Sequence, residues 1–466
     1  MPDLEPLYTA AEMRAAEARY PGYPETVPEL MDRAGGAAAE ISLGLFPEAR
    51  RWTVVCGGGS NGGDGRVMAA RLEAAGRQAR LVDAKAGERD LGEPDVVVDA
   101  LFGTGFGGEP RQDAAALIEA VNAVGAPVVA IDLPSGVDAS TGEVAGAAVR
   151  ATATVTFHAR KVGLEVAPGR FRAGSVHVAD IGLERVETDN QLVGTSILDS
   201  VPRRGPEDNK YTSGHVLVVG GSQGLTGAPS LTAMAALRAD AGYVTVAAPS
   251  STLPVFEHRL LEAVKRPLPD SGGGVGEGAA DVVLELAGKA HAVALGPGLG
   301  RGSGVQELVR RVLAEVALPM VVDADALYRL EPADWPAPRV LTPHEGELAR
   351  LLGRPSAEVA AHRLACVREA ADRFGCVVLL KGADTLVAAP GRSGVLVIAL
   401  GLPSLSTAGT GDVLTGILGA FLAKGMDARW AAAAAAAAQQ RASVEAPQRS
   451  GLVAGDVIEA LPRALG

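Results

Sequence analysis

The sequence predicts two α/β domains, each with a mainly parallel sheet between two layers of helices. Short apolar runs alternate with helical stretches, which is the pattern of a parallel sheet covered on both faces. The 466 residues exceed the usual size of one domain. The alternation breaks between Leu183 and Asp208, where charged residues and prolines gather without a periodic face. We therefore predict domains at 1–205 and 206–466, with a linker from about residue 184.

The first domain is expected to alternate helices and strands. The predicted helices are Ala10–Tyr20, Val27–Leu45, Arg66–Ala75 and Ala114–Val124. The predicted strands are Trp52–Cys56, Gln78–Val82, Asp95–Leu101, Pro127–Leu133, Thr152–His158 and Ser175–Val178. Most of these strands are short and apolar, as buried strands of a parallel sheet are.

The second domain repeats this scheme. Its predicted strands are His215–Val219, Tyr243–Ala247, Ala290–Leu295, Met320–Asp323, Val377–Leu380 and Leu386–Ala389. Helices are expected at Ser230–Ala239, after Asp412, and at the alanine run Trp430–Ala438, which fits a closely packed internal helix better than disorder. Ligands of such sheets bind beyond the carboxyl ends of the strands, where the unusual loops of this chain lie.

The composition excludes several classes of partner. Lys and Arg number 43 against 55 Asp and Glu, for a net charge of −12, and the basic residues are dispersed, which argues against a nucleic-acid surface. No apolar run is long enough to span a bilayer, and no apolar signal segment follows the N-terminus. The three cysteines share no metal-ligand spacing and fit a reducing compartment. We expect a cytoplasmic protein that binds small molecules and forms a homo-oligomer, with a tetramer as the candidate state.

The segment Gly409–Asp412 carries the most chemical information. Two glycines precede a carboxylate where a helix is expected to begin. Backbone N–H groups at a helix start bind phosphate, and the dipole adds to that attraction. Because Asp412 would repel an anion, it is better placed to take a proton from a hydroxyl that receives a phosphoryl group. The simpler alternative is a helix start with a favourably placed acid.

Further motifs follow other predicted strands of the second domain. Lys381-Gly382-Ala383-Asp384-Thr385 follows one strand, and Gly296–Gly300 follows another. A lysine beside glycines suits a phosphate. His344, within Thr342–Glu347, could be a ligand contact or a purely structural histidine.

The first domain has its own glycine-rich segment, Gly57–Gly65, between a strand and a helix. Such a segment is a moderate sign of phosphate binding, and the alternative is a tight turn with Asn61 in the left-handed region. Asp64 does not fit a simple phosphate cradle and suggests a second role.

Two more carboxylates of this domain, Asp99 and Asp132, end predicted strands. Either one could merely cap the turn that follows. Together with Asp64, Asn61 and Ser135, they form an oxygen-rich group at one edge of the sheet, which suits a hard monovalent or divalent cation.

The second domain resembles the ADP/ATP-dependent NAD(P)H-hydrate dehydratases, a branch of the ribokinase-like fold. The resemblance covers about residues 206–466 and rests on Asn209-Lys210-Tyr211, Gly214–Ser222, Thr226–Pro229, Gly296–Gly300, Leu341–Glu347, Lys381–Thr385 and Ala408–Asp412. It implies a hydrate-binding site formed by Ala228, Gly298, His344 and Asp412. It also implies an adenine-nucleotide site formed by Lys381, Gly382, Ala383, Asp384, Thr385 and Gly411.

The chemistry implied by this resemblance is a dehydration that passes through a phosphate ester. Asp412 would deprotonate the C6 hydroxyl of the hydrate, and ADP (converted to AMP) or ATP, with Mg²⁺ bridging its phosphates, would phosphorylate that hydroxyl. Phosphate leaves far more easily than hydroxide, so the ring nitrogen can expel it. No compact carboxylate cluster in the sequence identifies protein ligands for Mg²⁺.

The first domain resembles the NAD(P)H-hydrate epimerases, whose fold is Rossmann-like, from Leu30–Gly35 through the loops above to Phe157–Leu164. The resemblance implies K⁺ ligands at Asn61, Asp99 and Ser135. It implies hydrate contacts at Ser60, Asn61, Gly62, Gly63, Asp64, Gly103, Thr104, Gly105, Phe106, Gly107, Gly108, Glu109 and Asp132. Two residues depart from the family pattern: Ser60 stands where Asn is usual, and Asp32 where Glu is usual.

Epimerisation at C6 requires acid–base help to a departing and returning hydroxyl, for which Asp64 and Asp132 are both candidates. Together, the two resemblances imply a bifunctional enzyme that interconverts the R and S hydrates and dehydrates the S form. One alternative is a ribokinase-like small-molecule kinase of the hydroxymethylpyrimidine or hydroxyethylthiazole type fused to a nucleotide-binding module. Another is that the first domain is a non-catalytic sensing or scaffold module.

Overall fold

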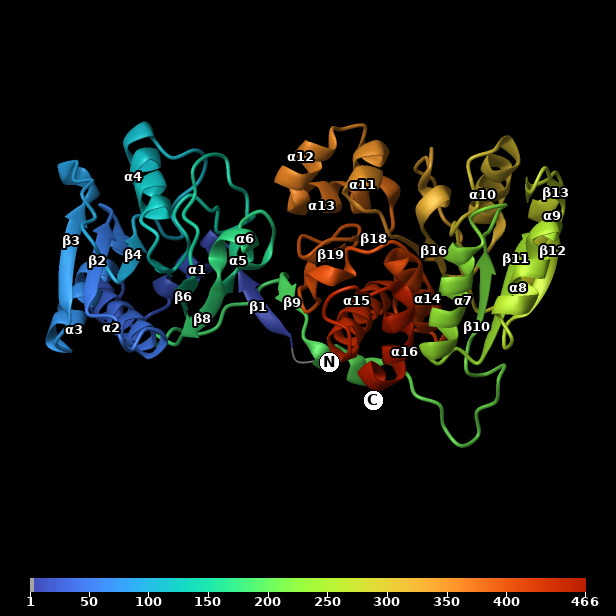
Figure 1. Ribbon diagram of the computed structural model, residues 1–466, viewed down its shortest axis with the longest axis horizontal. Coiled ribbons are helices and arrows are strands. Elements are labelled where there is room, and N and C mark those ends of the chain that lie inside the picture. The colour runs from blue at the N-terminus through green and yellow to red at the C-terminus, as the bar shows by residue number, and fades with distance from the viewer. Residues whose placement is uncertain (1–3) are drawn as a thin grey trace. The chain divides into compact units, whose positions relative to one another are not determined.

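The computed structural model describes residues 4–466, without the side chain of Ser303, and divides into two compact units (Figure 1). The first unit is Pro6–Gln191 with Ala360–Arg363, and the second is Leu192–Val359 with Leu364–Gly466. Ile197 and Leu198 are buried in the hydrophobic core of the second unit. The segment just before residue 205 thus packs with the second unit, and the boundary between the two functional domains stays a prediction.

The first unit contains a six-stranded parallel sheet in the order β3-β2-β4-β5-β6-β8. Its strands are β2 (Arg51–Cys56), β3 (Gln78–Asp83), β4 (Val96–Ala100), β5 (Val128–Ile131), β6 (Ala153–Phe157) and β8 (Ser175–Ala179). A parallel pair joins β1 (Glu5–Tyr8) and β7 (Arg160–Lys161). The helices are α1 (Ala10–Ala18), α2 (Val27–Leu45), α3 (Ser60–Ala74), α4 (Gln112–Ala123), α5 (Val162–Glu165) and α6 (Arg170–Ala173).

Alternate residues of the first sheet enter two different cores. Val54 and Val98 pack with side chains of α2 and α3, whereas Val55 and Val97 pack with side chains of α4. Because successive side chains of a strand point to opposite faces, both faces are covered, and the predicted three-layer architecture is confirmed.

Helix α3 begins earlier than the sequence suggested. It starts at Ser60 rather than near Arg66, so Asn61 is helical and does not adopt the left-handed conformation of the turn alternative. The glycines of this segment are required by close packing. A Cβ on Gly62 would lie 1.9 Å from the Gly57 oxygen, and one on Gly65 would lie 2.5 Å from Ala100 Cβ.

The sheet of the second unit follows the order β12-β11-β10-β15-β16-β17-β18-β19-β20, in which the strands are parallel from β12 to β18 and antiparallel from there to β20. The strands are β10 (His215–Val219), β11 (Tyr243–Pro249), β12 (Val264–Leu268), β15 (Ala292–Leu295), β16 (Met320–Val322), β17 (Arg339–Leu341), β18 (Val377–Leu380), β19 (Thr385–Ala388) and β20 (Leu396–Ile398). A hairpin joins β13 (Asp270–Ser271) and β14 (Gly274–Val275), and the short strand β9 (Gln191–Leu192) precedes the unit.

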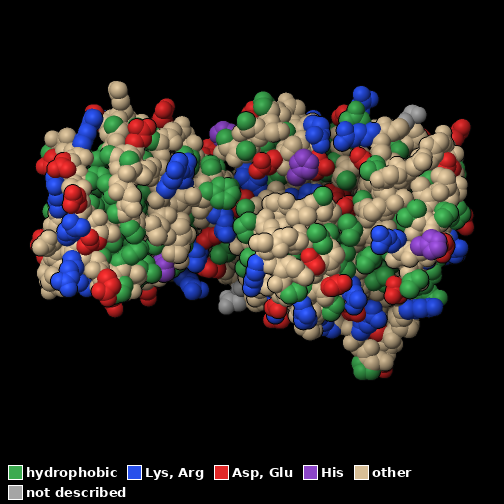
Figure 2. All heavy atoms as spheres, viewed as in Figure 1, with side chains coloured by type: hydrophobic (Ala, Val, Ile, Leu, Met, Phe, Trp, Pro, Cys, Tyr) green, Lys and Arg blue, Asp and Glu red, His purple; other side chains and the backbone are tan. Residues whose placement is uncertain are grey.

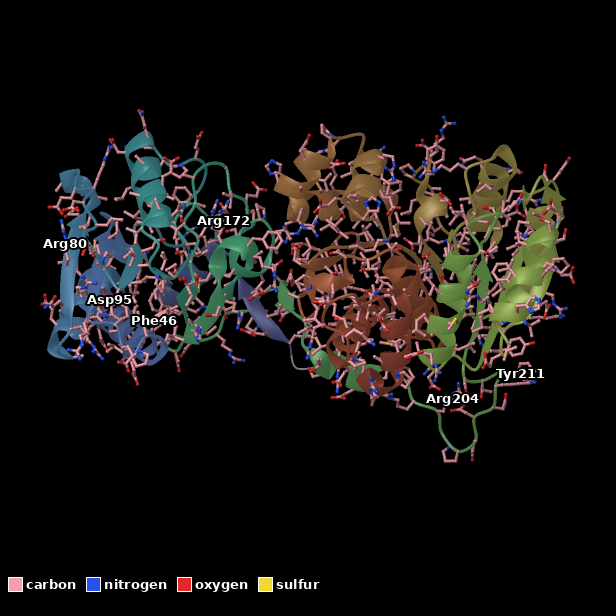
Figure 3. The ribbon with its side chains drawn as sticks, viewed as in Figure 1. Phe46, Arg80, Asp95, Arg172, Arg204 and Tyr211 are labelled. Atoms are coloured by element: carbon pink, nitrogen blue, oxygen red, sulfur yellow. The ribbon has the colours of Figure 1, made fainter. Side chains whose placement is uncertain are left out.

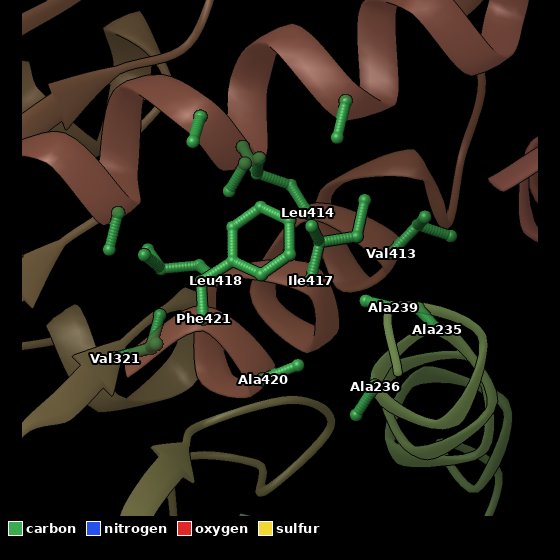
Figure 4. Packing of buried hydrophobic residues seen from close by; sticks show 14 of the residues in the cluster. Ala235, Ala236, Ala239, Val321, Val413, Leu414, Ile417, Leu418, Ala420 and Phe421 are labelled. Carbon is green, nitrogen blue, oxygen red and sulfur yellow. The ribbon is translucent and has the colours of Figure 1, made fainter. Parts of the chain in front are cut away.

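The helices of the second unit are α7 (Gly227–Arg238), α8 (Leu253–Arg259), α9 (Ala279–Ala287), α10 (Ser303–Glu315), α11 (Glu345–Leu352), α12 (Ser356–Ala361), α13 (Arg363–Phe374), α14 (Thr410–Ala423), α15 (Ala428–Glu445) and α16 (Ala454–Leu465). Helix α14 packs against α7, α15 and α16. In Figure 4, Val413 and Ala420 are the labelled side chains of α14 that lie nearest the labelled alanines of α7. Gly416 makes this approach possible, since a Cβ there would lie 2.2 Å from the Thr232 oxygen.

The alanine run forms part of α15 and is fully buried, so the prediction of a closely packed internal helix is confirmed. Within residues 4–466, the structure contains no helix that is both long and apolar enough to cross a membrane.

The segment Asn209-Lys210-Tyr211 precedes β10, at the amino end of that strand. Figure 3 shows Tyr211 and Arg204 on the loop that leads to this strand, with Tyr211 largely exposed. The motif therefore contributes to the resemblance without lying at the carboxyl edge of the sheet.

Candidate active sites

The start of α14 is arranged to hold an anion. Gly409 adopts φ 90° at the N-cap, a conformation that suits glycine, and no side chain caps the helix. The N–H groups of the first turn thus have no side-chain acceptor, and the helix dipole favours negative charge there. A Cβ on Gly411 would lie 3.4 Å from the Lys381 Nζ, so the lysine and the helix start meet.

Lys381 is held by a second carboxylate, Asp323, at the end of β16. Its Nζ lies 2.9 Å from Asp323 Oδ1, while Thr415 Oγ1 donates to Asp323 Oδ2 at 2.7 Å. Burial alone would raise the pKa of Asp323, but the Lys381 charge and these hydrogen bonds lower it overall. Burial would lower the pKa of Lys381, and Asp323 and Glu347 outweigh that effect and raise it. Both groups are therefore charged at neutral pH.

The charges of both Asp323 and Lys381 act on the Asp412 carboxyl. Burial, followed by the charge of Asp323, raises the pKa of Asp412 to about 7, against the opposing effect of Lys381. A carboxylate with such a pKa accepts a proton far more readily than an ordinary aspartate does.

Ala228 and Gly298 lie next to this helix start. Thr232 Oγ1 lies 3.0 Å from the backbone carbonyl oxygen of Asp412 and 3.1 Å from that of Ala228, and it donates to both. This hydroxyl therefore joins α7 to α14. Gly298 has φ 64°, and a Cβ there would lie 2.4 Å from the Leu225 oxygen. Thr232 thus joins Ala228 to Asp412, and Gly298 packs against Leu225, just before α7.

His344 is the N-cap of α11. Its Nδ1 accepts a hydrogen bond from the Gly346 N–H at 3.0 Å, and Glu347 bonds back to the His344 N–H at 2.9 Å. Because Nδ1 accepts, the neutral ring carries its proton on Nε2. Glu347 also lies 3.9 Å from Lys381 Nζ, so His344 borders the same site. Its structural role is established, and its predicted ligand contact stays a prediction.

The other predicted nucleotide-binding residues form the turn between β18 and β19. Thr385 Oγ1 donates to the Gly382 oxygen at 3.1 Å and accepts from Gln440 Nε2 at 3.3 Å. Asp384 is buried, and Ala383 lies on the exposed surface of the turn. The turn thus presents mainly backbone and Lys381 to a ligand.

The first unit has a cavity of about 730 Å³ at the carboxyl end of its sheet. Among the residues predicted to contact the hydrate, those lining it are Ser60, Asn61, Asp64, Gly103, Thr104, Gly105, Phe106, Gly107 and Asp132. Gly62, Gly63, Gly108 and Glu109 are not among its lining residues. A Cβ on Gly63 would lie 2.4 Å from the Met31 sulfur, so this glycine serves helix packing.

Asp132 and Asp64 differ in their partners. Asp132 adopts φ 65° and lies 2.7 Å from Nζ of Lys161, a fully buried side chain that also donates to Thr156 Oγ1 at 2.8 Å. The Thr104 N–H donates to Asp132 Oδ2 at 3.2 Å. For Asp64, burial and then the charge of Asp132 raise the pKa to about 8. The site therefore combines a protonated carboxyl with a carboxylate held by a cation.

The three predicted K⁺ ligands lie around the loop after β4. Ser135 Oγ donates to Asp99 Oδ1 at 2.7 Å and accepts from the Phe102 N–H at 2.9 Å. Burial raises the pKa of Asp99 to about 6 despite these hydrogen bonds. Both polar atoms of the Asn61 side chain are buried and have no hydrogen-bond partner within residues 4–466. An unsatisfied amide oxygen fits a cation ligand.

Two family descriptions match the chain. Residues 216–463 match the family described as NAD(P)H-hydrate dehydratase. Residues 27–86 and 77–163 match the family described as the YjeF-related protein N-terminus.

Curated proteins similar over nearly the whole chain are named bifunctional NAD(P)H-hydrate repair enzymes. The protein of Moorella thermoacetica is 38% identical over 98% of this chain and 96% of its own length. That of Escherichia coli strain K12 is 37% identical over 94% of this chain and 89% of its own. The chain belongs to the family of bifunctional NAD(P)H-hydrate repair enzymes.

Solved structures share the fold of the second unit. The ADP/ATP-dependent NAD(P)H-hydrate dehydratase of Bacillus subtilis, co-crystallised with ATP and Mg²⁺, is 28% identical with a TM-score of 0.51, covering 58% of this chain and 95% of that chain. A ribokinase-like protein of Enterococcus faecalis is 22% identical with a TM-score of 0.52, covering 60% and 97%. The predicted fold class is confirmed.

The sequence did not point to several charged residues of the two candidate sites. Asp323 ends a strand, so the rule that selected Asp99 and Asp132 would have found it. Lys161 and Glu17 carried no comparable signal. Glu17 lines the cavity of the first unit, and burial and then the charge of Asp132 raise its pKa.

Proposed function

We propose that the second unit dehydrates the S form of hydrated NADH or NADPH at the expense of ADP or ATP, and that the first unit interconverts the R and S forms. Family membership over nearly the whole chain supports both activities. The observation that carries the dehydratase assignment is the placement of Asp412, with a pKa of about 7, at an uncapped helix start beside Lys381.

In the proposed dehydration, Asp412 takes the proton of the C6 hydroxyl while the oxygen of that hydroxyl attacks the terminal phosphorus of the nucleotide. Lys381 and the N–H groups of the first turn of α14 hold the transferred phosphoryl group. Loss of phosphate from C6, together with a proton from C5, then restores the dihydronicotinamide ring. Asp323 fixes the position of Lys381 without contacting the substrate.

The predicted Mg²⁺ would neutralise part of the charge of the nucleotide phosphates. Within residues 4–466, no group of three or more His, Cys, Asp or Glu side chains could hold a metal ion. We infer that the nucleotide itself supplies most ligands of this ion.

In the proposed epimerisation, Asp64 and Asp132 have different roles. Asp64, protonated at neutral pH, donates its proton to the C6 hydroxyl, which leaves as water while the ring nitrogen forms a double bond to C6. Water returns to the other face and gives a proton to a carboxylate, for which Asp132, paired with Lys161, is available. Return of this proton from Asp132 to Asp64, through solvent in the cavity, restores the starting state, so the complete cycle consumes no proton.

We propose that Asn61, Ser135 and Asp99 hold the predicted K⁺. The unsatisfied side chain of Asn61 is the observation that supports this site. The ion would supply a positive charge beside Asn61, which lines the cavity. The cytoplasmic location and the homo-oligomeric state stay predictions.

One experiment tests both activities. The purified chain is incubated with mixed R and S hydrates of NADH and either ADP or ATP, and the absorbance of NADH is followed. We expect complete conversion, faster than spontaneous epimerisation allows. Conversion of only the S form would contradict the epimerase assignment. A stable phosphorylated product without NADH would instead favour a small-molecule kinase.

A further inference from the structure

The cavity of the first unit holds a third carboxyl group, which the epimerisation described above does not use. Glu17 lines this cavity of about 730 Å³ together with Asp64 and Asp132. The three groups come from separate elements: Glu17 from α1, Asp64 from α3, and Asp132 from the turn after β5. Carboxyl groups that share one cavity influence one another's ionisation, so their protons are coupled.

Helix α1 fixes the position of Glu17. Thr9 caps the start of the helix, and the Ala10 N–H donates to Ser140 Oγ at 3.0 Å, which ties this helix start to a loop of the same unit. Met13 is buried in the core and lies one turn before Glu17, so the two side chains share a helix face. Because Met13 also lines the cavity, this face is directed toward it.

Charges link Glu17 to the other two carboxyl groups. Burial and then the charge of Asp132 raise the pKa of Glu17, against smaller opposing effects of Lys161 and Arg14. The charge of Glu17 in turn contributes to the raised pKa of Asp64. A carboxyl whose pKa is raised toward neutrality can both accept and release a proton at the pH of the reaction.

The epimerisation moves one proton from one carboxyl group to another. Asp64 gives its proton to the departing hydroxyl and becomes ionised, while Asp132 takes a proton from the returning water and becomes neutral. The next turnover requires this proton to pass from Asp132 to Asp64. Its departure restores the ion pair of Asp132 with Lys161, whose Nζ lies 2.7 Å away.

Glu17 is the side chain of the cavity best suited to transfer this proton. Besides the three carboxyl groups, the ionisable side chains among the described lining residues are Arg14 and Tyr23. Neither a guanidinium nor a neutral phenol takes up an extra proton near neutral pH. Lys161 is fully buried and paired with Asp132, so its ammonium group already has a partner.

We propose that Glu17 transfers the proton from Asp132 back to Asp64 after each epimerisation, with water in the cavity completing the path. The proposal rests on the epimerase function given above. The Glu17 carboxylate takes the proton that leaves Asp132 and passes it to the Asp64 carboxylate, so all three groups end in their starting states. Glu17 acts through the other two groups and makes no bond to the hydrate.

The test measures R–S exchange of the NADH hydrates in the full chain, by chromatography at neutral pH in dilute buffer. Glu17→Gln should lower the exchange rate by about tenfold or more, because the amide keeps the size of the side chain but takes up no proton. Glu40→Gln is the matched control, since it removes an exposed carboxylate of α2 that does not line the cavity. This control should exchange the hydrates at the parent rate.

A small proton carrier distinguishes proton transfer from a structural role. Imidazole gains and loses a proton near neutral pH and is small beside a cavity of about 730 Å³. On the face shown in Figure 2, acidic and basic side chains are intermixed around β2 and β3 of the first unit, so imidazolium meets no large patch of one charge there. Added imidazole, at constant pH and ionic strength, should restore exchange in Glu17→Gln several-fold and leave the parent and Glu40→Gln unchanged.

Two results would overturn the proposal while leaving the epimerase function intact. One is an exchange rate of Glu17→Gln within about twofold of the parent rate. The other is a loss of exchange that imidazole does not restore. Absence of exchange in the parent chain would instead refute the epimerase function, and the proposal with it.

Glu17→Asp provides a second variant in which the carboxyl is kept but set back by one methylene group. It should lose less exchange than Glu17→Gln and show an intermediate dependence on imidazole. Pulse proteolysis in urea reports whether the first unit of each variant is folded, and Glu17→Asp decides the matter if Glu17→Gln is unfolded. A Glu17→Asp exchange rate that is lowered but independent of imidazole would contradict the proposal.

Discussion

The two candidate sites use the same three groups in different arrangements. Each has a carboxyl with a strongly raised pKa, a second carboxylate and a lysine paired with that carboxylate. In the second unit, Lys381 pairs with Asp323, which is fully hidden, and only Asp412 is offered to a substrate. In the first unit, Lys161 pairs with Asp132, which lines the same cavity as Asp64.

This difference matches the two reactions. A phosphoryl transfer needs one base and a cation that remains near the anion, so the hidden carboxylate only holds the lysine in place. An epimerisation must remove and return a hydroxyl, so two carboxyl groups of opposite protonation state are useful in one cavity. The two sites therefore differ in one respect: the carboxylate paired with the lysine is buried in the second unit and lines the cavity in the first.

Replacement of Asp412 should have the largest effect. Asp412→Asn should lower the dehydration rate by about 10²–10⁴-fold, because the base is lost, and should leave R–S exchange unchanged. Dehydration is measured from NADH absorbance and exchange by chromatography of the two hydrates. Asp456→Asn, a matched change in the first turn of α16, should leave both rates unchanged. Loss of exchange in Asp412→Asn would contradict the separation of the sites.

Breaking the buried pair of the first unit should have the next largest effect. Lys161→Met or Asp132→Asn alone leaves one buried group unpaired and should reduce the stability of the first unit by about 3–5 kcal/mol, while the double variant should lose less. Pulse proteolysis of the full chain in urea measures this stability. Strictly additive losses would show that the two groups do not interact.

The pH dependence of the two activities should run in opposite directions. Dehydration requires ionised Asp412 and should rise through a pH of about 7, whereas exchange requires protonated Asp64 and should fall above about 8. Initial rates from pH 5.5 to 9.5, measured separately for each reaction, test this contrast.

Asp323→Asn should shift the dehydration inflection to lower pH, because it removes a negative charge near Asp412 and releases Lys381. Asp325→Asn, whose charge raises the pKa of Asp412 less than that of Asp323 does, should give a smaller shift in the same direction. A shift to higher pH in either variant would rule out this account of Asp412.

Ser60→Asn, which restores the usual residue of the epimerase family, should have the smallest effect. Ser60 is exposed at the start of α3, and such substitutions usually change free energies by no more than about 0.5 kcal/mol, so KM for exchange should stay within about threefold. A larger decrease in KM would show that the serine limits hydrate binding.

Periodicity and strand-end acids made much of this architecture predictable. The helix Val27–Leu45 and the strands His215–Val219 and Val377–Leu380 have the bounds given by the sequence, because apolar runs between turn residues leave little choice of element. The start of α3 was not predictable, since Gly62 and Gly65 resemble turn residues until the strand that packs against them is known. Lys161 was missed because its partner, Asp132, is distant in the sequence.

The alanine helix α15 has a consequence for how this enzyme can change. Its buried face consists of one methyl group after another, so a larger side chain would have to displace neighbouring backbone rather than fill a gap. Overpacking of this kind typically costs about 1–3 kcal/mol. Directed evolution of the second unit should therefore accept changes in the loops that follow its strands and reject larger side chains in α15. New substrate preferences would then arise in those loops, while the spacing between the sheet and its inner helices stays fixed.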